Sequence, residues 1–164
     1  AYSEQYIEQQ AVAGTLEVDE NGNFTYQDNR SACFGSCEVT AGSFSGTFTA
    51  PDAKNTAVLR AKCIAEAQLR APGLPASGDR VALMSNSNAE AARFAKGLLR
   101  NANKYGHTGQ FSKALLTGYA AASLLQLKTD KASAWDGPVF VYKVRHDFVG
   151  NKSTLYFRDL LEGY

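Results

Sequence analysis

Hydrophobic and polar residues alternate along the first fifty positions of the chain in the manner of β-strands. Residues 15–26, TLEVDENGNFTY, hold two short alternating runs on either side of Asn21-Gly22, a dipeptide that favours a tight hairpin turn. Residues 38–50, EVTAGSFSGTFTA, alternate small polar residues with Phe44 and Phe48, as in a thin strand or an ordered loop. The pattern predicts an N-terminal β-hairpin followed by extended structure.

A helical spacing replaces this alternation after Pro51. It predicts a first helix over residues 52–70, which the run Pro72-Gly73-Leu74-Pro75 ends. The capping-box sequence Ser87-Asn88-Ala89-Glu90 predicts the start of a second helix, and Gly106 its end. A third, central helix is expected from Thr108, because apolar residues from Phe111 to Leu125 recur at helical spacing.

The last part of the chain returns to a β pattern. Phe140, Tyr142, Val144 and Phe148 share one face of a strand, and Gly150-Asn151 is a suitable turn into the next strand. The predicted fold class is therefore α+β, with an N-terminal β-hairpin, three Ala-rich helices and a C-terminal β-hairpin. We expect an extended segment, 1–50, and a helical body with the C-terminal hairpin, 51–164, within one domain overall.

Composition narrows the classes of function. The chain has 164 residues, of which 45% are hydrophobic and 20% charged, as in a globular protein. Seventeen basic and sixteen acidic residues leave a net charge of +1, without the basic field that duplex nucleic acid requires. No apolar run approaches the ~20 residues of a transmembrane helix. The sequence starts without Met and without a signal-peptide core, which predicts a processed chain.

Three cysteines, Cys33, Cys37 and Cys63, cannot all pair with one another. A Cys33–Cys37 disulfide is sterically possible but closes a very small ring. A structural zinc site is disfavoured, because no second Cys or His pair follows, and Cys63, His107 and His146 come from three separate elements. We therefore expect no metal site.

Cys63 lies on the predicted first helix, away from its main apolar stripe and beside Arg60 and Arg70. The simpler interpretation is a small apolar side chain in a core, which is common for free cysteine. The alternative is a thiol whose thiolate is favoured by neighbouring cations, with both arginines available to carboxylates of a group bonded to the sulfur.

Catalytic motifs are missing from the sequence: it has no nucleophile elbow, P-loop, dinucleotide fingerprint or HExxH. A non-enzymatic function is expected, although partners of Cys63 such as His107 or His146 can meet it only in space. Phe44 and Phe48 stand on a backbone rich in Gly, Ser and Thr. They are predicted to order against a partner.

The segments NRSACFGSCE (29–38) and LRAKCIAEAQLR (59–70), with Ala-rich helices that carry arginines, resemble the phycobilisome linkers of red algae, especially the bilin-bearing γ type. This resemblance implies a non-enzymatic linker of a light-harvesting antenna, bound to phycobiliprotein α and β subunits at the stromal face of the chloroplast thylakoid. It further implies a linear tetrapyrrole, a bilin, attached to Cys63. Cys33 and Cys37 would be further attachment sites, and Arg60 and Arg70 would contact the chromophore.

Two other hypotheses remain open on the sequence. One is a secreted or periplasmic α+β binding module with a Cys33–Cys37 disulfide and a buried Cys63. The other is a small hydrolase that depends on an activated Cys63.

Overall fold

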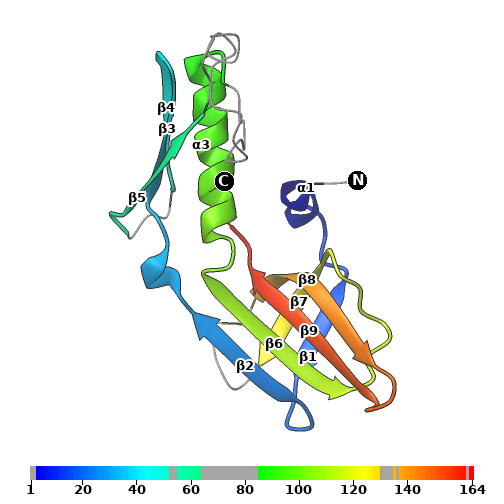
Figure 1. The fold of residues 1–164 in the computed structure, drawn as a ribbon. Helices are drawn as coiled ribbons and strands as arrows, with labels where there is room; N and C mark the ends of the chain where they lie inside the picture. Colours follow the sequence, from blue (N-terminus) through cyan, green and yellow to red (C-terminus); the bar gives the residue numbers. More distant parts are fainter. Residues whose placement is uncertain (1–2, 52–54, 64–84, 130–134, 136, 162) are drawn as a thin grey trace. The chain divides into compact units, whose positions relative to one another are not determined.

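The computed structural model describes residues 3–51, 55–63, 85–129, 135, 137–161 and 163–164. The chain divides into two compact units, each assembled from separate stretches of sequence. Unit 1 is formed by Ala1–Arg30 with Lys104–Leu160, and unit 2 by Ser31–Asn103 with Leu161–Tyr164. Most of the regular structure is β (Figure 1).

Unit 1 is a curled sheet of six strands, in the order β1-β7-β8-β9-β6-β2 (Figure 1). The strands are β1 (Gly14–Val18), β2 (Asn23–Asp28), β6 (His107–Ala114), β7 (Ser123–Thr129), β8 (Gly137–Asp147) and β9 (Lys152–Asp159). Only β1 and β7 run parallel; the other neighbouring pairs are antiparallel. A short helix, α1 (Glu4–Glu8), precedes the first strand.

The core of unit 1 follows from the twofold alternation of its strands. In β6, for example, Gly109 and Phe111 are buried, whereas Thr108 and Gln110 are only partly covered. The inward residues form one hydrophobic cluster: Leu16, Val18, Phe111, Leu125, Leu127, Trp135, Val139, Val141, Leu155 and Phe157. The polar residues are left on the other face of the sheet.

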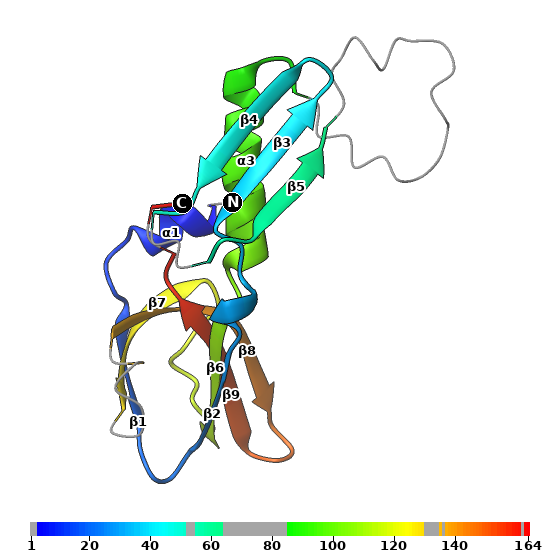
Figure 2. The same cartoon turned by 90° about the vertical axis from the view of Figure 1, so that its left-hand side faces the viewer.

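Unit 2 packs one long helix, α3 (Asn88–Asn103), on one face of a three-stranded sheet (Figure 2). The sheet has the order β4-β3-β5, with β3 (Ser36–Ala41), β4 (Phe44–Thr49) and β5 (Val58–Lys62). The buried residues Ala91, Ala95 and Leu99 recur every four positions along α3, which places them on one helix face. Small residues on this face let the helix approach closely: a Cβ atom at Gly46 would lie only 2.2 Å from the Ala92 nitrogen.

The predicted fold class is wrong, because the described residues are mostly in β-strands. Of the three predicted helices, one is present among them. That helix is α3, and its predicted cap is present: Glu90 N–H donates to Ser87 Oγ at 3.1 Å. The predicted helix 52–70 contains β5, which pairs with β3 in parallel; its residues 52–54 and 64–70 lie outside the described part. The predicted third helix is replaced by β6 and β7. Long-range strand pairing decides these segments, because their local patterns fit either structure.

The predicted N-terminal hairpin is also wrong. Both strands exist, but β1 pairs with β7 and β2 pairs with β6, so the Asn21-Gly22 turn joins two strands that are not partners. Other consecutive strands do pair antiparallel: β3 with β4, β7 with β8, and β8 with β9. Gly42, with φ 62°, lies in the β3–β4 turn, and Asn151, with φ 52°, lies in the β8–β9 turn at the position predicted from the sequence.

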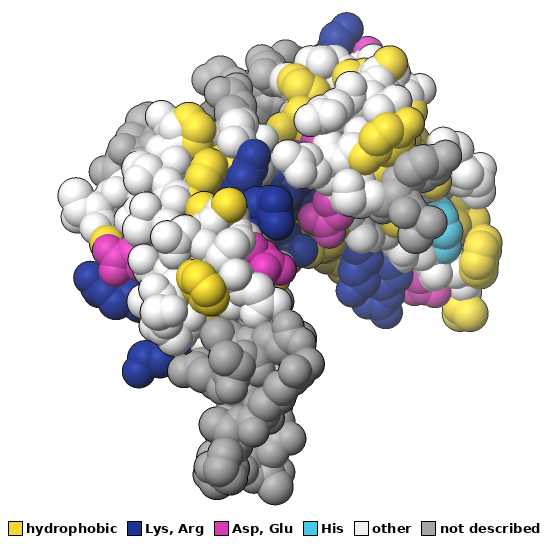
Figure 3. All heavy atoms as spheres, turned by 90° about the horizontal axis from the view of Figure 1, so that it is seen from above, with side chains coloured by type: hydrophobic (Ala, Val, Ile, Leu, Met, Phe, Trp, Pro, Cys, Tyr) yellow, Lys and Arg dark blue, Asp and Glu magenta, His cyan; other side chains and the backbone are white. Residues whose placement is uncertain are grey.

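The surface charge is mixed, and no described helix is suited to cross a membrane. On the face drawn in Figure 3, Lys and Arg side chains occur together with Asp and Glu side chains, in keeping with the net charge of +1. Within the described ranges, no helix has the length and apolar character needed to cross a membrane.

Candidate functional site

A pocket of about 310 Å³ opens on unit 1. Four strands that are neighbours in the sheet, β8, β9, β6 and β2, supply its walls. The lining residues are Thr25, Tyr26, Gln27, Thr108, Gly109, Gln110, Tyr142 and Tyr156. None of them carries a charge at neutral pH, and each side chain except that of Gly109 offers a hydroxyl or a primary amide. The pocket therefore combines polar groups with aromatic rings and carries no charge.

Strand register explains why these polar groups meet. Thr25 is paired with Gln110, and Gln110 with Tyr156, so that the three lie in one row across β2, β6 and β9. An irregularity in the β8–β9 register between Val141 and Lys143 adds Tyr142 beside this row. A bulge of this kind re-aims a side chain, and here the Tyr142 ring lies 6.3 Å from the Tyr156 ring.

Aromatic contacts continue beyond the pocket. The Tyr105 ring meets the Tyr142 ring edge to face, with centroids 5.1 Å apart, and the Lys143 ammonium lies 4.9 Å from the centroid of Tyr156. Burial raises the pKa of Tyr142, and the neighbouring Tyr105 and Tyr156 phenols add to the effect. The Tyr142 phenol therefore keeps its proton and remains a hydrogen-bond donor at neutral pH.

On the apolar side of the same strands, a buried histidine lies beside a carboxylate and an indole. His107 Nδ1 is 2.5 Å from Asp159 Oδ2, and the His107 ring stacks on Trp135 with centroids 3.8 Å apart. The Trp135 indole N–H is buried and has no hydrogen-bond partner among the described residues. Because His107 is only 5% exposed, this group stabilises the end of the sheet rather than meeting a substrate.

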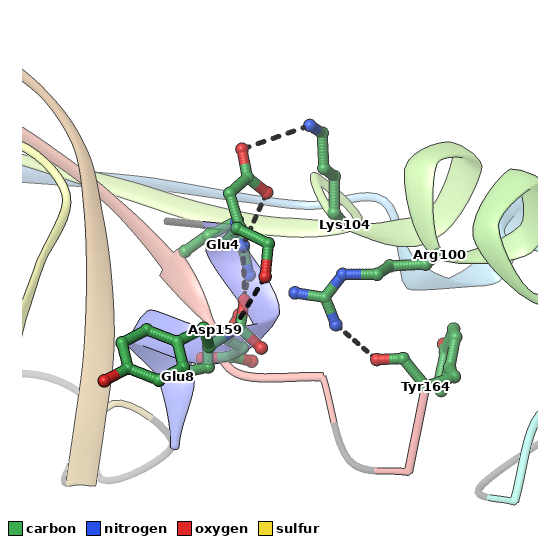
Figure 4. A network of polar contacts seen from close by, with 9 residues as sticks. Glu4, Glu8, Arg100, Lys104, Asp159 and Tyr164 are labelled. Atoms are coloured by element: carbon green, nitrogen blue, oxygen red, sulfur yellow. Dashed lines mark hydrogen bonds and ion pairs between the residues drawn. The ribbon is translucent and has the colours of Figure 1, made fainter. Parts of the chain in front are cut away.

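An ion-pair cluster anchors α1 to the sheet of unit 1. The Arg158 guanidinium is fully buried, and its Nη2 lies 2.5 Å from Glu8 Oε1 and 3.1 Å from Glu4 Oε2. It also stacks over the Phe140 ring at 4.5 Å. Glu4 pairs in addition with Lys104 at 3.4 Å (Figure 4). The Glu4 and Glu8 carboxylates therefore compensate the charge of Arg158, which is the buried arginine among the described residues of the sheet.

In unit 2, polar contacts hold the C-terminal residue and the segment before β3 against α3. Arg100 donates to the Tyr164 carbonyl (Figure 4). The Asn103 amide donates to the Phe34 carbonyl at 2.7 Å and accepts from the Phe34 N–H at 2.9 Å. These bonds fix the last turn of α3 against the segment that leads into β3.

The cysteines that sequence analysis singled out all belong to unit 2, and none of them is bridged in a disulfide. Cys37 and Cys63 are buried in its hydrophobic cluster, whereas Cys33 is partly exposed, with its thiol 4.0 Å from the Asn103 carbonyl. The Cys33–Cys37 disulfide of the binding-module hypothesis does not form in the structure. Cys37 is fully buried in that cluster, whereas Cys33 contacts the carbonyl at the end of α3. Burial raises the pKa of both Cys37 and Cys63, the opposite of the direction expected for a thiol activated by guanidiniums.

The other predicted site residues are placed as follows. Arg60 is exposed on β5 and pairs with Glu38 at 3.2 Å, and Arg70 lies outside the described residues. The Phe44 and Phe48 rings are partly buried against the core of unit 2, and the Phe48 ring contacts Tyr164 at 6.1 Å. Bilin attachment at the three cysteines, chromophore contact by the arginines and partner contact by the phenylalanines stay predictions.

The histidines offer no partner to Cys63 within its own unit, since both belong to unit 1. His146 Nδ1 is 2.7 Å from Ser153 Oγ, which also accepts the Leu116 N–H. Ser153 is fully buried, so this pair is structural. Within the described ranges, no three His, Cys, Asp or Glu side chains gather as a metal site would need.

Comparison with known proteins identifies the fold. No family model and no curated protein matches the sequence. Solved structures do match: a tail protein from Neisseria meningitidis MC58 has a TM-score of 0.60 at 10% identity, over 92% of this chain and 45% of that chain. The 43 kDa tail protein of prophage MuSo2 from Shewanella oneidensis has a TM-score of 0.64 at 11% identity, over 92% and 43%. A chain of the virion of a native gene transfer agent particle has a TM-score of 0.53 at 13% identity, over 92% and 32%.

This chain therefore spans less than half the length of each of these three proteins, and the likeness shows a shared fold. It overturns the family that short cysteine-containing segments suggested. The structural neighbours are two tail proteins, one of them from a prophage, and a chain of a gene transfer agent virion, not phycobilisome linkers. The antenna-linker function, the phycobiliprotein partners and the thylakoid location are accordingly wrong, and neither the secreted or periplasmic module nor the cysteine hydrolase gains support.

The pocket is a site that sequence reasoning missed. Its lining comes from strands up to 131 positions apart in the chain, from Thr25 to Tyr156, and no local motif connects them. One signal was present: Thr108, Gln110 and Ser112 alternate with apolar or small residues. Read with a period of two, this segment would have indicated a strand with a polar face.

Proposed function

We propose that this chain is a structural component of a phage tail or of a tail-like particle, assembled with other particle proteins. The observation that carries the proposal is the shared fold over 92% of the chain with tail proteins from two different bacteria. The likeness to a chain of a gene transfer agent virion supports the same class of assembly. A component of this kind acts by presenting fixed surfaces to its neighbours, not by chemistry at a catalytic centre.

One surface of unit 1 suits such a contact. Phe148 and Val149 stand at the β8–β9 turn with 73% and 101% of their surface exposed. The turn is braced, because the Asp147 carboxylate accepts the N–H groups of Val149 and Gly150 at 3.1 and 2.9 Å. A braced turn presents two large apolar side chains at low entropic cost. In the proposed particle, these side chains pack into a neighbouring protein.

Deletion of the coding sequence tests the proposal. In cells that produce the particle, loss of the chain should yield particles with absent or shortened tails in negative-stain electron micrographs. Expression of the intact chain in trans should restore them, whereas expression of an unfolded variant should not. Normal tails in the deletion strain would refute the proposed role.

A further inference from the structure

The pocket of unit 1 has the chemistry of a small-molecule site. Its volume of about 310 Å³ is at the lower end of the range of about 300–1,000 Å³ that is usual for ligand sites. Two of its three tyrosines, Tyr142 and Tyr156, have their rings 6.3 Å apart, and Tyr26, two glutamines, two threonines and a glycine form the rest. We propose that this pocket binds a neutral carbohydrate, with a sugar ring against a tyrosine face and its hydroxyls on Gln110, Gln27 and the threonines.

The lining groups match a sugar in the kind of hydrogen bond that they make. Each glutamine amide and each threonine hydroxyl can both donate and accept, and so can every sugar hydroxyl. Gln110 lies between Thr25 and Tyr156 in the row across the strands, so adjacent hydroxyls of one ring can be bonded by adjacent strands. The C–H face of a pyranose is apolar and flat, and it complements the face of a tyrosine ring.

Charge favours a neutral ligand over an acidic one. No lining residue is ionised at neutral pH. The Lys143 ammonium lies over the Tyr156 ring, and the Arg158 guanidinium is buried and paired with Glu4 and Glu8. An acidic sugar would find no ionised group in the lining itself, whereas a neutral sugar needs none.

An extended proline-rich peptide is the main rival occupant, because such peptides dock in grooves lined by aromatic residues. Its proline residues have no N–H group, so that their carbonyls only accept hydrogen bonds. The acceptor oxygens of Gln27, Gln110 and the threonines would then have few donors to meet. The mixed donor and acceptor lining therefore favours a polyol. The chemistry of this pocket is the same whether or not the chain belongs to a particle.

The test is an NMR titration of the ¹⁵N-labelled chain with four neutral probes: maltohexaose, cellohexaose, chitotetraose and a β-galactan oligomer. At least one should bind at millimolar concentration or below and shift amide signals of β2, β6, β8 and β9. Gln110→Ala and Tyr142→Ala should each weaken that binding by about fivefold to tenfold, the loss expected for one hydrogen bond or one aromatic contact. Gln126→Ala, a glutamine change on β7 outside the pocket, is the matched control and should leave the affinity unchanged.

Amide spectra of each variant establish that it is folded before its affinity is compared. Three results would overturn the proposal. The first is no shift with any of the four probes at the solubility limit. The second is binding that Gln110→Ala and Tyr142→Ala leave intact, which would place the sugar elsewhere. The third is that a PxxP peptide shifts the pocket signals while all the sugars fail to do so.

Discussion

Arg158 of β9 and Glu8 of α1 form an ion pair of 2.5 Å in which both side chains are buried, although 150 positions separate them in the sequence. This ion pair helps to attach α1 to β9 within unit 1. Glu4 supplies a second, more exposed carboxylate to the same guanidinium, at 3.1 Å. The two glutamates contribute unequally to the stability of unit 1. Leaving a charge without its partner costs more free energy the more deeply the pair is buried.

Glu8→Ala should destabilise unit 1 by about 3 kcal/mol, the lower end of the cost of leaving a buried charge without its partner. Glu4→Ala should cost about 1 kcal/mol or less, since its side chain is 40% exposed and exposed pairs contribute little. Urea unfolding followed by circular dichroism measures both values. Equal losses in the two variants would contradict this assignment.

The contact of α3 with β4 predicts opposite effects at two glycines. Gly46→Val places atoms 2.2 Å from the Ala92 backbone nitrogen, so it should destabilise unit 2 by about 3 kcal/mol or prevent its folding. Gly97→Ala on α3 meets no atom within 4 Å and should stabilise the helix by about 1 kcal/mol. Thermal unfolding of both variants measures the difference. A Gly46→Val protein as stable as the parent would refute the close packing of α3.

Local signals in the sequence were enough to predict α3. The Ser87 and Glu90 side chains cap its start, and the small apolar stripe through Ala91 and Ala95 defines its buried face. The sheet of unit 1 could not be predicted in the same way, because β1 pairs with β7 across 111 positions, as Gly14 with Leu125. The apolar residues of 108–125 fit both helical and alternating spacing. The choice is decided by strand pairing, of β6 with β2 and β9 and of β7 with β1 and β8.

Acid titration of Asp28 reports a surface contact. Hydrogen bonds from the Arg30 side chain, at 2.9 and 2.5 Å, and from its backbone N–H hold the pKa of Asp28 well below its usual range. The contact of Asp28 with Arg30 therefore stabilises the folded state fully above the usual carboxyl pKa. This stabilisation is lost as the pH falls through the lowered pKa of Asp28. Arg30→Ala should raise the Asp28 midpoint, as measured by carboxyl ¹³C shifts.

The matched control is Lys113→Ala. Lys113 hydrogen-bonds Asp19 and is the main reason that the pKa of Asp19 is lowered. This variant should raise the Asp19 midpoint and leave that of Asp28 unchanged. A midpoint of Asp28 that does not move in Arg30→Ala would show that another group holds the carboxylate.

Thiol labelling distinguishes the three cysteines. Cys33 is partly exposed, whereas Cys37 and Cys63 are buried with raised pKa values. Because the thiolate is the reactive form, iodoacetamide at pH 8 should label Cys33 first and the other two only after unfolding in urea. Intact mass measures the number of labels. Labelling of folded Cys63 as fast as Cys33 would contradict its place in the core.

The same mass measurement, made on the chain from its natural source, tests the predicted bilin attachment. An excess that equals a linear tetrapyrrole on Cys33, Cys37 or Cys63 would support it. Cysteine-containing peptides that all have the masses of the unmodified sequence would reject it.

Particle assembly is tested most directly by density-gradient sedimentation of lysates from cells that produce the chain, with quantitative mass spectrometry of each fraction. The intact chain should sediment with the particles in a constant ratio to their other proteins. Phe148→Ser with Val149→Ser should fold normally, since both side chains are exposed, yet remain at the top of the gradient. An intact chain that stays at the top, while complete particles sediment without it, would contradict the proposed role.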